Sequence, residues 1–227
     1  MITTKAPASQ AASASKRTRS AADTREKILK AGQVEFVQHG FAGARIDRIV
    51  ERAGSNPRMI NHYFGGKAGL YVAVLEEALS DLRRQELKID VEHLEPLAGL
   101  VQLFDFMSQH FESNTNLVRL LSNENIQKAR YLKSSNKVQE MASPVLSNIA
   151  RLLRRGEADG TLRSGLDSLE VYVMLVALCQ FHLSNVHTLS AIFATDLSKP
   201  SWRASRHATA RTMVQAFLKP DPCQQCC

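Results

Sequence analysis

The 227-residue sequence predicts an all-α fold, made of a small N-terminal helical domain and a larger helical C-terminal domain. Apolar residues recur at the three- and four-residue spacing of a helix face, and no segment alternates convincingly between apolar and polar residues as a half-buried strand does. Pro96, Pro144 and Pro200 each fall near an expected helix start, where proline is tolerated. The hydrophobic share of 44% is enough for a core and too high for general disorder.

The excess positive charge is confined to the N-terminal third. Residues 1–67 hold 12 Lys and Arg against 5 Asp and Glu, whereas residues 68–227 hold 17 of each. Residues 1–20 are rich in Ala, Ser and Thr without apolar periodicity, which predicts a flexible basic arm. This arm explains only part of the excess, so the asymmetry indicates a module for a polyanion joined to a neutral module.

The first expected helix begins at "ADTREKIL". Asp23 and Glu26 have the spacing of a capping box there. Ile28 and Phe36 lie at helical spacing along one face, and Gly40 is the expected stop.

Two short helices follow. "RIDRIVERA" is the first, and Gly54 ends it as a left-handed residue would. Asn56 suits an N-cap and Pro57 a first helical position, so "PRMINHYF" is a helix of about two turns. Ile60 and Phe64, four residues apart, face the core.

Two short helices joined by a turn with glycine form a helix-turn-helix, whose second helix presents polar side chains to the DNA major groove. Gly65 and Gly66 predict a sharp exit from this second helix. The next helix then starts at Lys67 and points free N–H groups and its positive dipole end at a phosphate. An ordinary helical hairpin is the alternative interpretation.

Eight residues are candidates for DNA contact, and a solvated face or a bracing role between helices is the alternative for them. Asn61 has the side chain that reads adenine, and Lys67 combines position with charge. The full set is Arg25, Arg45, Arg58, Met59, Asn61, His62, Tyr63 and Lys67.

Helices continue from 67 to the end of the chain, near 67–88, 96–113, 116–133, 143–157, 167–186 and 201–218, with a short one near 188–194. The expected organisation is a basic arm (1–20), a helix-turn-helix DNA-binding domain (21–67), a helical ligand-binding and dimerisation domain (68–219) and a disordered tail (220–227). Cys179 is expected to be a buried thiol. Cys223, Cys226 and Cys227 lack the further ligands that a structural zinc site needs.

An effector site is expected among polar groups that interrupt apolar helices, because buried polar groups need partners and a ligand can supply them. Arg130 would be the natural clamp for a carboxylate. Ordinary core, surface or dimer-interface positions are the alternatives. The candidates are Phe111, Asn125, Arg130, Gln180 and His182.

The stretches "TREKILKAGQVEFVQHGF", "IDRIVERAG" and "NPRMINHYFGGKAGLYVAVLE" resemble the N-terminal domain of the TetR family of bacterial transcriptional regulators. Residues 123–132, 152–175 and 184–200 are similar to the branch that contains the repressor of nicotinate degradation. The resemblance implies a cytoplasmic homodimer, associated with the nucleoid when bound to DNA, that represses a catabolic operon from a palindromic operator. It also implies release by a small-molecule effector, a nitrogen heterocycle or aromatic acid such as nicotinate or 6-hydroxynicotinate.

Two positions depart from the family pattern. Ala44-Arg45 stands where a pair of hydroxyl residues usually opens the second helix, which removes a cap and adds a cation. Asn61 stands where Tyr is usual, so base preference is expected to differ.

Other classes of protein fit less well. The sequence has no G-x-S-x-G or H-E-x-x-H motif and no Gly-rich phosphate loop after a strand, so no enzyme, cofactor or metal site is expected. No apolar run approaches the ~18 residues of a membrane span, and the start lacks the apolar stretch of a secretory signal. "EVYVMLVALCQFHL" is apolar nearly all round and predicts burial on more than one side, as in a dimer. An activator, or a DNA-binding protein without ligand control, is the alternative function.

Overall fold

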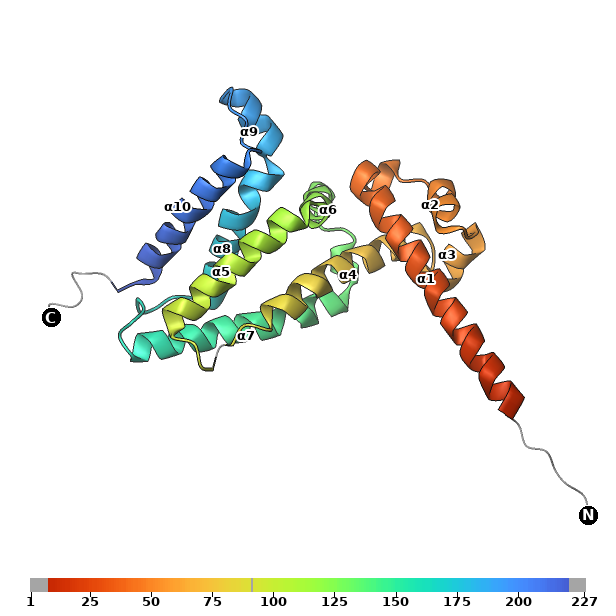
Figure 1. The fold of residues 1–227 in the computed structure, drawn as a ribbon, viewed down its shortest axis with the longest axis horizontal. Coiled ribbons are helices and arrows are strands. Elements are labelled where there is room, and N and C mark those ends of the chain that lie inside the picture. The colour runs from red at the N-terminus through yellow and green to blue at the C-terminus, as the bar shows by residue number, and fades with distance from the viewer. Residues whose placement is uncertain (1–7, 91, 221–227) are drawn as a thin grey trace, which may run out of the picture. The chain divides into compact units, whose positions relative to one another are not determined.

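The computed structural model describes residues 8–90 and 92–220, with side chains from Ala21 onward except that of Ser143. Within these residues all regular structure is helical, as the sequence predicts (Figure 1). The chain forms two packed units. The first comprises the described residues up to Leu75 with Arg130–Ser134, and the second comprises the remainder. The division falls after Leu75, whereas the sequence placed the domain boundary after residue 67.

The first unit is built on α1 (Ala8–Gly43), α2 (Ile46–Ala53) and α3 (Pro57–Phe64), which pack on one another. Its core contains Ile28 and Phe36 from α1, Ile49 from α2 and Ile60 from α3, all fully or almost fully buried. The apolar faces that the sequence predicts for α1, α2 and α3 therefore meet in one core.

The start of α1 corrects the prediction. The helix begins at Ala8, so Asp23 and Glu26 lie in its interior and do not cap it. The sequence before Asp23 is rich in alanine, which has the highest helix propensity, and it continues the helix toward the N-terminus. Residues 1–7 of the expected arm lie outside the described residues. Gly40 is confirmed as a break, since its backbone is non-helical (φ 61°, ψ −178°) and the helix is kinked there.

The remaining helices belong wholly or partly to the second unit. They are α4 (Lys67–Glu86), α5 (Pro96–Ser113), α6 (Thr115–Ile126), α7 (Asn136–Ala158), α8 (Ser168–Ser184), α9 (Val186–Ile192) and α10 (Pro200–Leu218), with a short 3-10 turn at Leu132–Ser134. The bounds of α4, α5, α8 and α10 agree with the sequence prediction to within two residues. The expected helix 116–133 is shorter, because α6 ends at Ile126.

Pro144 was expected near a helix start and lies instead inside α7. The helix begins earlier, where the Ser135 hydroxyl accepts a hydrogen bond of 3.3 Å from the backbone N–H of Val138. An interior proline loses one backbone hydrogen bond. Burial of Ile149 and Leu152 on the same helix, which packs against α5, stabilises it in spite of that loss.

Helix α5 is central to the second unit and packs against α6, α7, α8 and α10. Phe104, Met107 and Phe111 are buried on it and belong to the core of the second unit. Cys179 of α8 is buried as expected, with its Sγ 3.8 Å from the Phe104 carbonyl oxygen. Burial raises the pKa of this thiol to about 12. Cys223, Cys226 and Cys227 lie outside the described residues.

No single helix among the described residues combines the length and hydrophobicity needed to cross a bilayer. Helices α8 and α9 meet that criterion by length and composition only as a pair, bent by 66° at their junction.

A buried charged network joins α4 to α8. The Arg83 guanidinium lies 2.5 Å from Oε2 of Glu86 and 2.5 Å from the Tyr172 hydroxyl oxygen, and that hydroxyl donates to Oε1 of Glu86 at 3.2 Å. Burial raises the pKa of Glu86 and raises that of Tyr172 to about 12, while the Arg83 charge opposes both shifts. Each of the three polar side chains in this network thus has a hydrogen-bond partner.

Removing the Tyr172 hydroxyl should leave two buried charged groups short of a partner. We expect Tyr172→Phe to lower the free energy of unfolding by about 1–3 kcal/mol, measured by urea denaturation at one fixed protein concentration. Thr188→Val, which removes an exposed hydroxyl that bonds only within its own stretch of chain, is the control and should have little effect. Equal midpoints for Tyr172→Phe and the parent chain would contradict this role.

Candidate nucleic-acid interface

The turn between α2 and α3 follows from local sequence. Gly54 adopts the left-handed conformation (φ 57°, ψ 44°), and the next N–H, that of Ser55, donates to the Val50 carbonyl at 2.9 Å. Asn56 then caps α3, because its Oδ1 accepts from the backbone N–H of Arg58 at 3.1 Å. Two helices joined by such a three-residue turn form a helix-turn-helix.

The exit from α3 is equally constrained. Gly65 (φ 70°) and Gly66 (φ 115°) both have positive φ angles, which other residues rarely adopt. At Gly69, in the first turn of α4, a Cβ atom would lie 1.7 Å from the Phe64 carbonyl oxygen. Only glycine permits this approach, so the N-terminus of α4 is held against the end of α3.

The surface of α3 divides into an inner and an outer face. Ile60 is buried and Phe64 is half-buried on the inner face. Five of the other six positions, all except Pro57, were the candidate base or phosphate contacts. Of these, Arg58, Asn61 and His62 are exposed, and Met59 and Tyr63 are half-buried.

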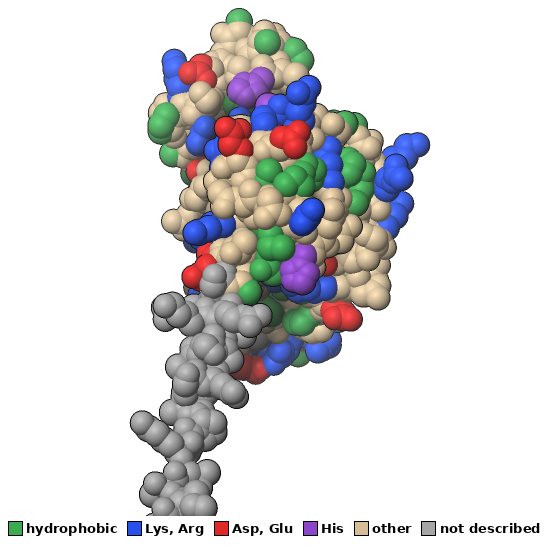
Figure 2. Space-filling model, turned by 90° about the vertical axis from the view of Figure 1, so that its right-hand side faces the viewer, with side chains coloured by type: hydrophobic (Ala, Val, Ile, Leu, Met, Phe, Trp, Pro, Cys, Tyr) green, Lys and Arg blue, Asp and Glu red, His purple; other side chains and the backbone are tan. Residues whose placement is uncertain are grey.

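The four cations among the candidate DNA contacts, Arg25, Arg45, Arg58 and Lys67, form no ion pair with a carboxylate of the described residues. The Arg25 guanidinium lies 4.9 Å from the centre of the Phe64 ring. The Lys67 ammonium lies 4.7 Å from that of Phe41, and burial lowers its pKa against the opposing charge of Glu35. Figure 2 looks onto the side that carries α1, α2 and α3, where Lys and Arg side chains lie among Asp, Glu and uncharged side chains.

One buried carboxylate fixes α2 to α1. Glu35 Oε1 accepts from the backbone N–H of Arg45 at 2.9 Å and from Nε of Arg48 at 2.7 Å. The His39 ring lies 3.9 Å from its other oxygen, and the Glu35 side chain is 2% exposed. The carboxylate also lies at the positive N-terminal end of α2, which favours its charged form.

The electrostatic balance at Glu35 favours ionisation. Burial alone would raise the pKa of Glu35, but hydrogen bonds from Arg48 and from the Arg45 backbone, with the nearby charges, lower it below its ordinary value. Sequence reasoning missed this residue. The available signal was an acidic side chain in line with Ile28 and Ala31 on the apolar face of α1.

An aromatic cluster was also missed. Phe41 contacts Tyr71 at 5.4 Å and Tyr131 at 4.3 Å between ring centres, and Phe36 contacts Tyr71 at 4.8 Å. Tyr131 belongs to the short segment Arg130–Ser134 that packs with the first unit. The cluster therefore includes Phe41, the ring beneath Lys67.

The five candidate effector residues occupy different environments. Phe111 and His182 are buried in the second unit, where Gln180 is half-buried. Asn125 is exposed on α6. Arg130 belongs to the first unit, with its guanidinium 5.8 Å from the Tyr131 ring. Four of the five therefore belong to the second unit, and of these only Asn125 is exposed.

These features define a class of protein: a helix-turn-helix domain followed by a separate helical domain. Residues 28–74 match the family model of bacterial regulatory proteins of the tetR family, and residues 96–214 match that of the tetracyclin repressor-like C-terminal domain. The chain therefore belongs to the TetR family of bacterial transcriptional regulators, as the sequence resemblance indicated.

Similar proteins cover most of the chain. The HTH-type transcriptional repressor NicS of Pseudomonas putida is 32% identical over 181 residues, which is 80% of this chain and 85% of NicS. The HTH-type transcriptional repressor SCO4008 of Streptomyces coelicolor is 29% identical over 160 residues, which is 70% of this chain and 77% of SCO4008. The crystal structure of SCO4942 from Streptomyces coelicolor superposes with a TM-score of 0.65 at 25% identity, over 86% of this chain and 98% of SCO4942.

Replacing the bracing carboxylate should loosen α2. We expect Glu35→Gln to lower the urea midpoint of the chain at pH 7 and to weaken DNA binding several-fold. Because the folded pKa of Glu35 is lowered, its stabilising charge is fully present above the unfolded pKa of about 4.3 and is lost as the pH falls below it. The difference in urea midpoint between the parent chain and Glu35→Gln should therefore shrink from pH 7 to pH 3.

Glu26→Gln is the matched control, since Glu26 lies on the same helix and pairs with Lys30 on an exposed surface. A Glu35→Gln chain as stable as this control at pH 7 would rule out the bracing role.

Proposed function

We propose that the chain is a dimeric transcriptional repressor that binds a palindromic operator in the bacterial cytoplasm and leaves the DNA when a small-molecule effector binds. The observation that carries the proposal is the exposed polar face of α3, accompanied in the same unit by four cations without carboxylate partners. Such cations suit phosphates, while side chains on the second helix of a helix-turn-helix suit base edges. The names of NicS and SCO4008 as repressors support the sign of regulation.

Lys67 and Asn61 have separate roles in this proposal. Lys67 is the first residue of α4, where N–H groups without intrahelical acceptors favour a phosphate. Asn61 is exposed on α3 and would read a base. Arg25, Arg45 and Arg58 would add phosphate contacts around it.

Dimerisation is supported by apolar side chains left exposed on α8 and α10. Leu169, Val173 and Phe181 of α8 are 53–57% exposed, and Met213 of α10 is 56% exposed. The opposite face of α8 is buried, as Val171, Leu175 and Cys179 show. A helix that is apolar on both faces needs a second covering surface. A second copy of the chain provides one, and two-fold symmetry matches a palindromic operator.

The effector is proposed to act through a two-state equilibrium. A ligand that binds the second unit more tightly in one conformation shifts the chain toward that conformation. Helix α4 contributes residues to both units, so it is the proposed mechanical connection. The resemblance to the nicotinate branch makes nicotinate and 6-hydroxynicotinate the first effectors to test.

The test is fluorescence anisotropy with a labelled duplex from upstream of the chain's own gene, against a scrambled duplex, with and without each compound. Binding that prefers the upstream duplex and is released by either compound is the expected result. Specific binding without release would exclude these two effectors. Salt-dependent binding without sequence preference would contradict the repressor.

A phosphate contact by Lys67 and a base contact by Asn61 predict different losses of DNA binding when each side chain is removed. Lys67→Ala should weaken binding to both duplexes and reduce the slope of log K against log salt by about 1. Asn61→Ala should relax preference at one base pair, worth about 1–3 kcal/mol, with an unchanged salt slope. Titrations at several salt concentrations separate the two. Equal losses on all DNA from both substitutions would contradict the role given to Asn61.

A charge on the exposed face of α8 should separate the subunits. We expect Val173→Asp to convert a dimer into a monomer in light scattering after gel filtration, because an unpaired carboxylate inside an interface is strongly unfavourable. Ile126→Asp is the control, since Ile126 is 76% exposed at the end of α6 and belongs to neither α8 nor α10. A dimer that survives Val173→Asp would place the interface elsewhere.

A further inference from the structure

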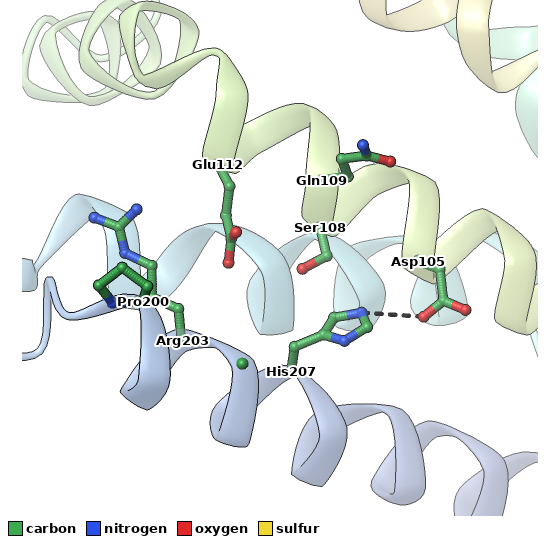
Figure 3. A pocket seen from close by; sticks show the side chains of 8 residues that line it. Asp105, Ser108, Gln109, Glu112, Pro200, Arg203 and His207 are labelled. Atoms are coloured by element: carbon green, nitrogen blue, oxygen red, sulfur yellow. Dashed lines mark ion pairs between the residues drawn. The ribbon is translucent and has the colours of Figure 1, made fainter.

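A groove of about 430 Å³ runs between α5 and α10 of the second unit (Figure 3). Asp105, Ser108 and Glu112 line it from α5, and Pro200, Arg203 and His207 line it from α10. Ser108 and Glu112 point from α5 toward α10 (Figure 3). This volume lies within the range of sites for small molecules, about 300–1,000 Å³.

His182 of α8 is not one of the lining residues but lies next to two of them, Glu112 and Arg203. Its Nε2 lies 4.0 Å from Oε1 of Glu112, which lines the groove, and its side chain is 5% exposed. Both ring nitrogens are buried and neither has a hydrogen-bond partner among the described residues. Burial, assisted by the charges of Arg206 and Arg203, lowers the pKa of His182 to about 4. The neutral ring therefore offers one donor and one acceptor at neutral pH.

Two arginines of α10 lie at this site: Arg203 lines the groove, and Arg206 interacts electrostatically with the lining residue Glu112. Neither Arg203 nor Arg206 has a side-chain ion pair within the described part of the chain, and Nε of Arg203 is buried without a partner. Burial lowers the pKa of Arg206.

The acids nearby do not balance these two cations. Asp105 is already paired, at 3.0 Å with the His207 ring and at 3.0 Å with Nε of Arg211. Glu112 is the one remaining carboxylate among the lining residues, so the set formed by Glu112, Arg203 and the neighbouring Arg206 lacks one negative charge.

We propose that this groove binds a small organic monocarboxylate, with the carboxylate at Arg203 and a polar ring or chain atom of the ligand at His182. Guanidinium–carboxylate pairs supply a strong, directional hydrogen-bonded contact. The ligand would also partner one of the two buried ring nitrogens of His182. The site rests on the proposed function, since it is where the effector would act, and it replaces Arg130 by Arg203 as the carboxylate clamp.

The chain carries its own probe of this site. Trp202 is its only tryptophan, and its ring centre lies 6.0 Å from that of His182. Binding in the groove should therefore change the fluorescence of Trp202. Nicotinate and benzoate are the probes, nicotinamide is the neutral counterpart of nicotinate, and inorganic phosphate is a small anion without a ring.

The experiment uses the full chain without DNA, by calorimetry and Trp202 fluorescence. We expect at least one of the two carboxylates to bind with Kd below about 1 mM, and nicotinamide and phosphate to bind at least about ten-fold more weakly. Arg203→Gln and His182→Leu should each weaken carboxylate binding by at least about ten-fold. Arg154→Gln, the same change as the first variant at an exposed position of α7, should have no effect.

A second readout separates binding from folding. His182→Leu removes two unpartnered buried nitrogens, so the ligand-free variant should melt at the same temperature as the parent chain or higher. A structural histidine would give the opposite result, a lower melting temperature.

Three outcomes would overturn the proposal. The first is carboxylate binding that survives both Arg203→Gln and His182→Leu, and the second is absence of binding by either carboxylate. The third is phosphate binding as tight as carboxylate binding, which would indicate an adventitious anion only. If an effector releases operator DNA equally from the parent chain and both groove variants, the groove is wrong and the repressor stands. If carboxylates bind in the groove but no operator is preferred, the repressor is wrong.

Discussion

The buried carboxylate of Glu35 is the interaction on which the rest of the first unit depends. It accepts hydrogen bonds from the Arg45 backbone and the Arg48 side chain, so one side chain of α1 sets where α2 begins. Because the turn at Gly54 and the cap at Asn56 fix α3 relative to α2, the same carboxylate indirectly orients α3. A charge can hold this position only because its hydrogen bonds offset the cost of burying it.

Features that depend on near neighbours in the chain were predictable, and those that depend on distant ones were not. Gly54, Asn56 and Pro57 specify the turn within a few residues, and the structure has it as predicted. Glu35 and Tyr131 acquire their partners only through folding, across 10 or more positions. The local pattern can place Glu35 on a buried face, but it cannot show which groups Glu35 contacts. Pro144 shows the reverse failure, in which tertiary packing of α7 overrides a local signal for a helix start.

The second unit contains two sites with buried polar side chains, and they differ in whether the hydrogen-bonding groups are satisfied. Glu86 and Tyr172 satisfy each other and Arg83, as a network that contributes to stability must. His182 is as deeply buried and its ring nitrogens satisfy nothing. An unpartnered buried group costs about 1–3 kcal/mol, a large share of a typical net stability of about 5–15 kcal/mol. The two sites therefore indicate different roles, structural for the first and ligand-binding for the second.

The same difference between satisfied and unsatisfied groups applies to the arginines that lack an ion pair. Arg58 is exposed, so water solvates it and its lack of a partner costs little. Its significance comes from its place on the outer face of α3, not from its charge alone. Arg203 differs, because Nε is removed from water without a protein partner. A buried donor without an acceptor is stabilised by whatever molecule fills the groove beside it, so the energetic argument for a ligand is stronger at Arg203 than the argument for DNA is at Arg58.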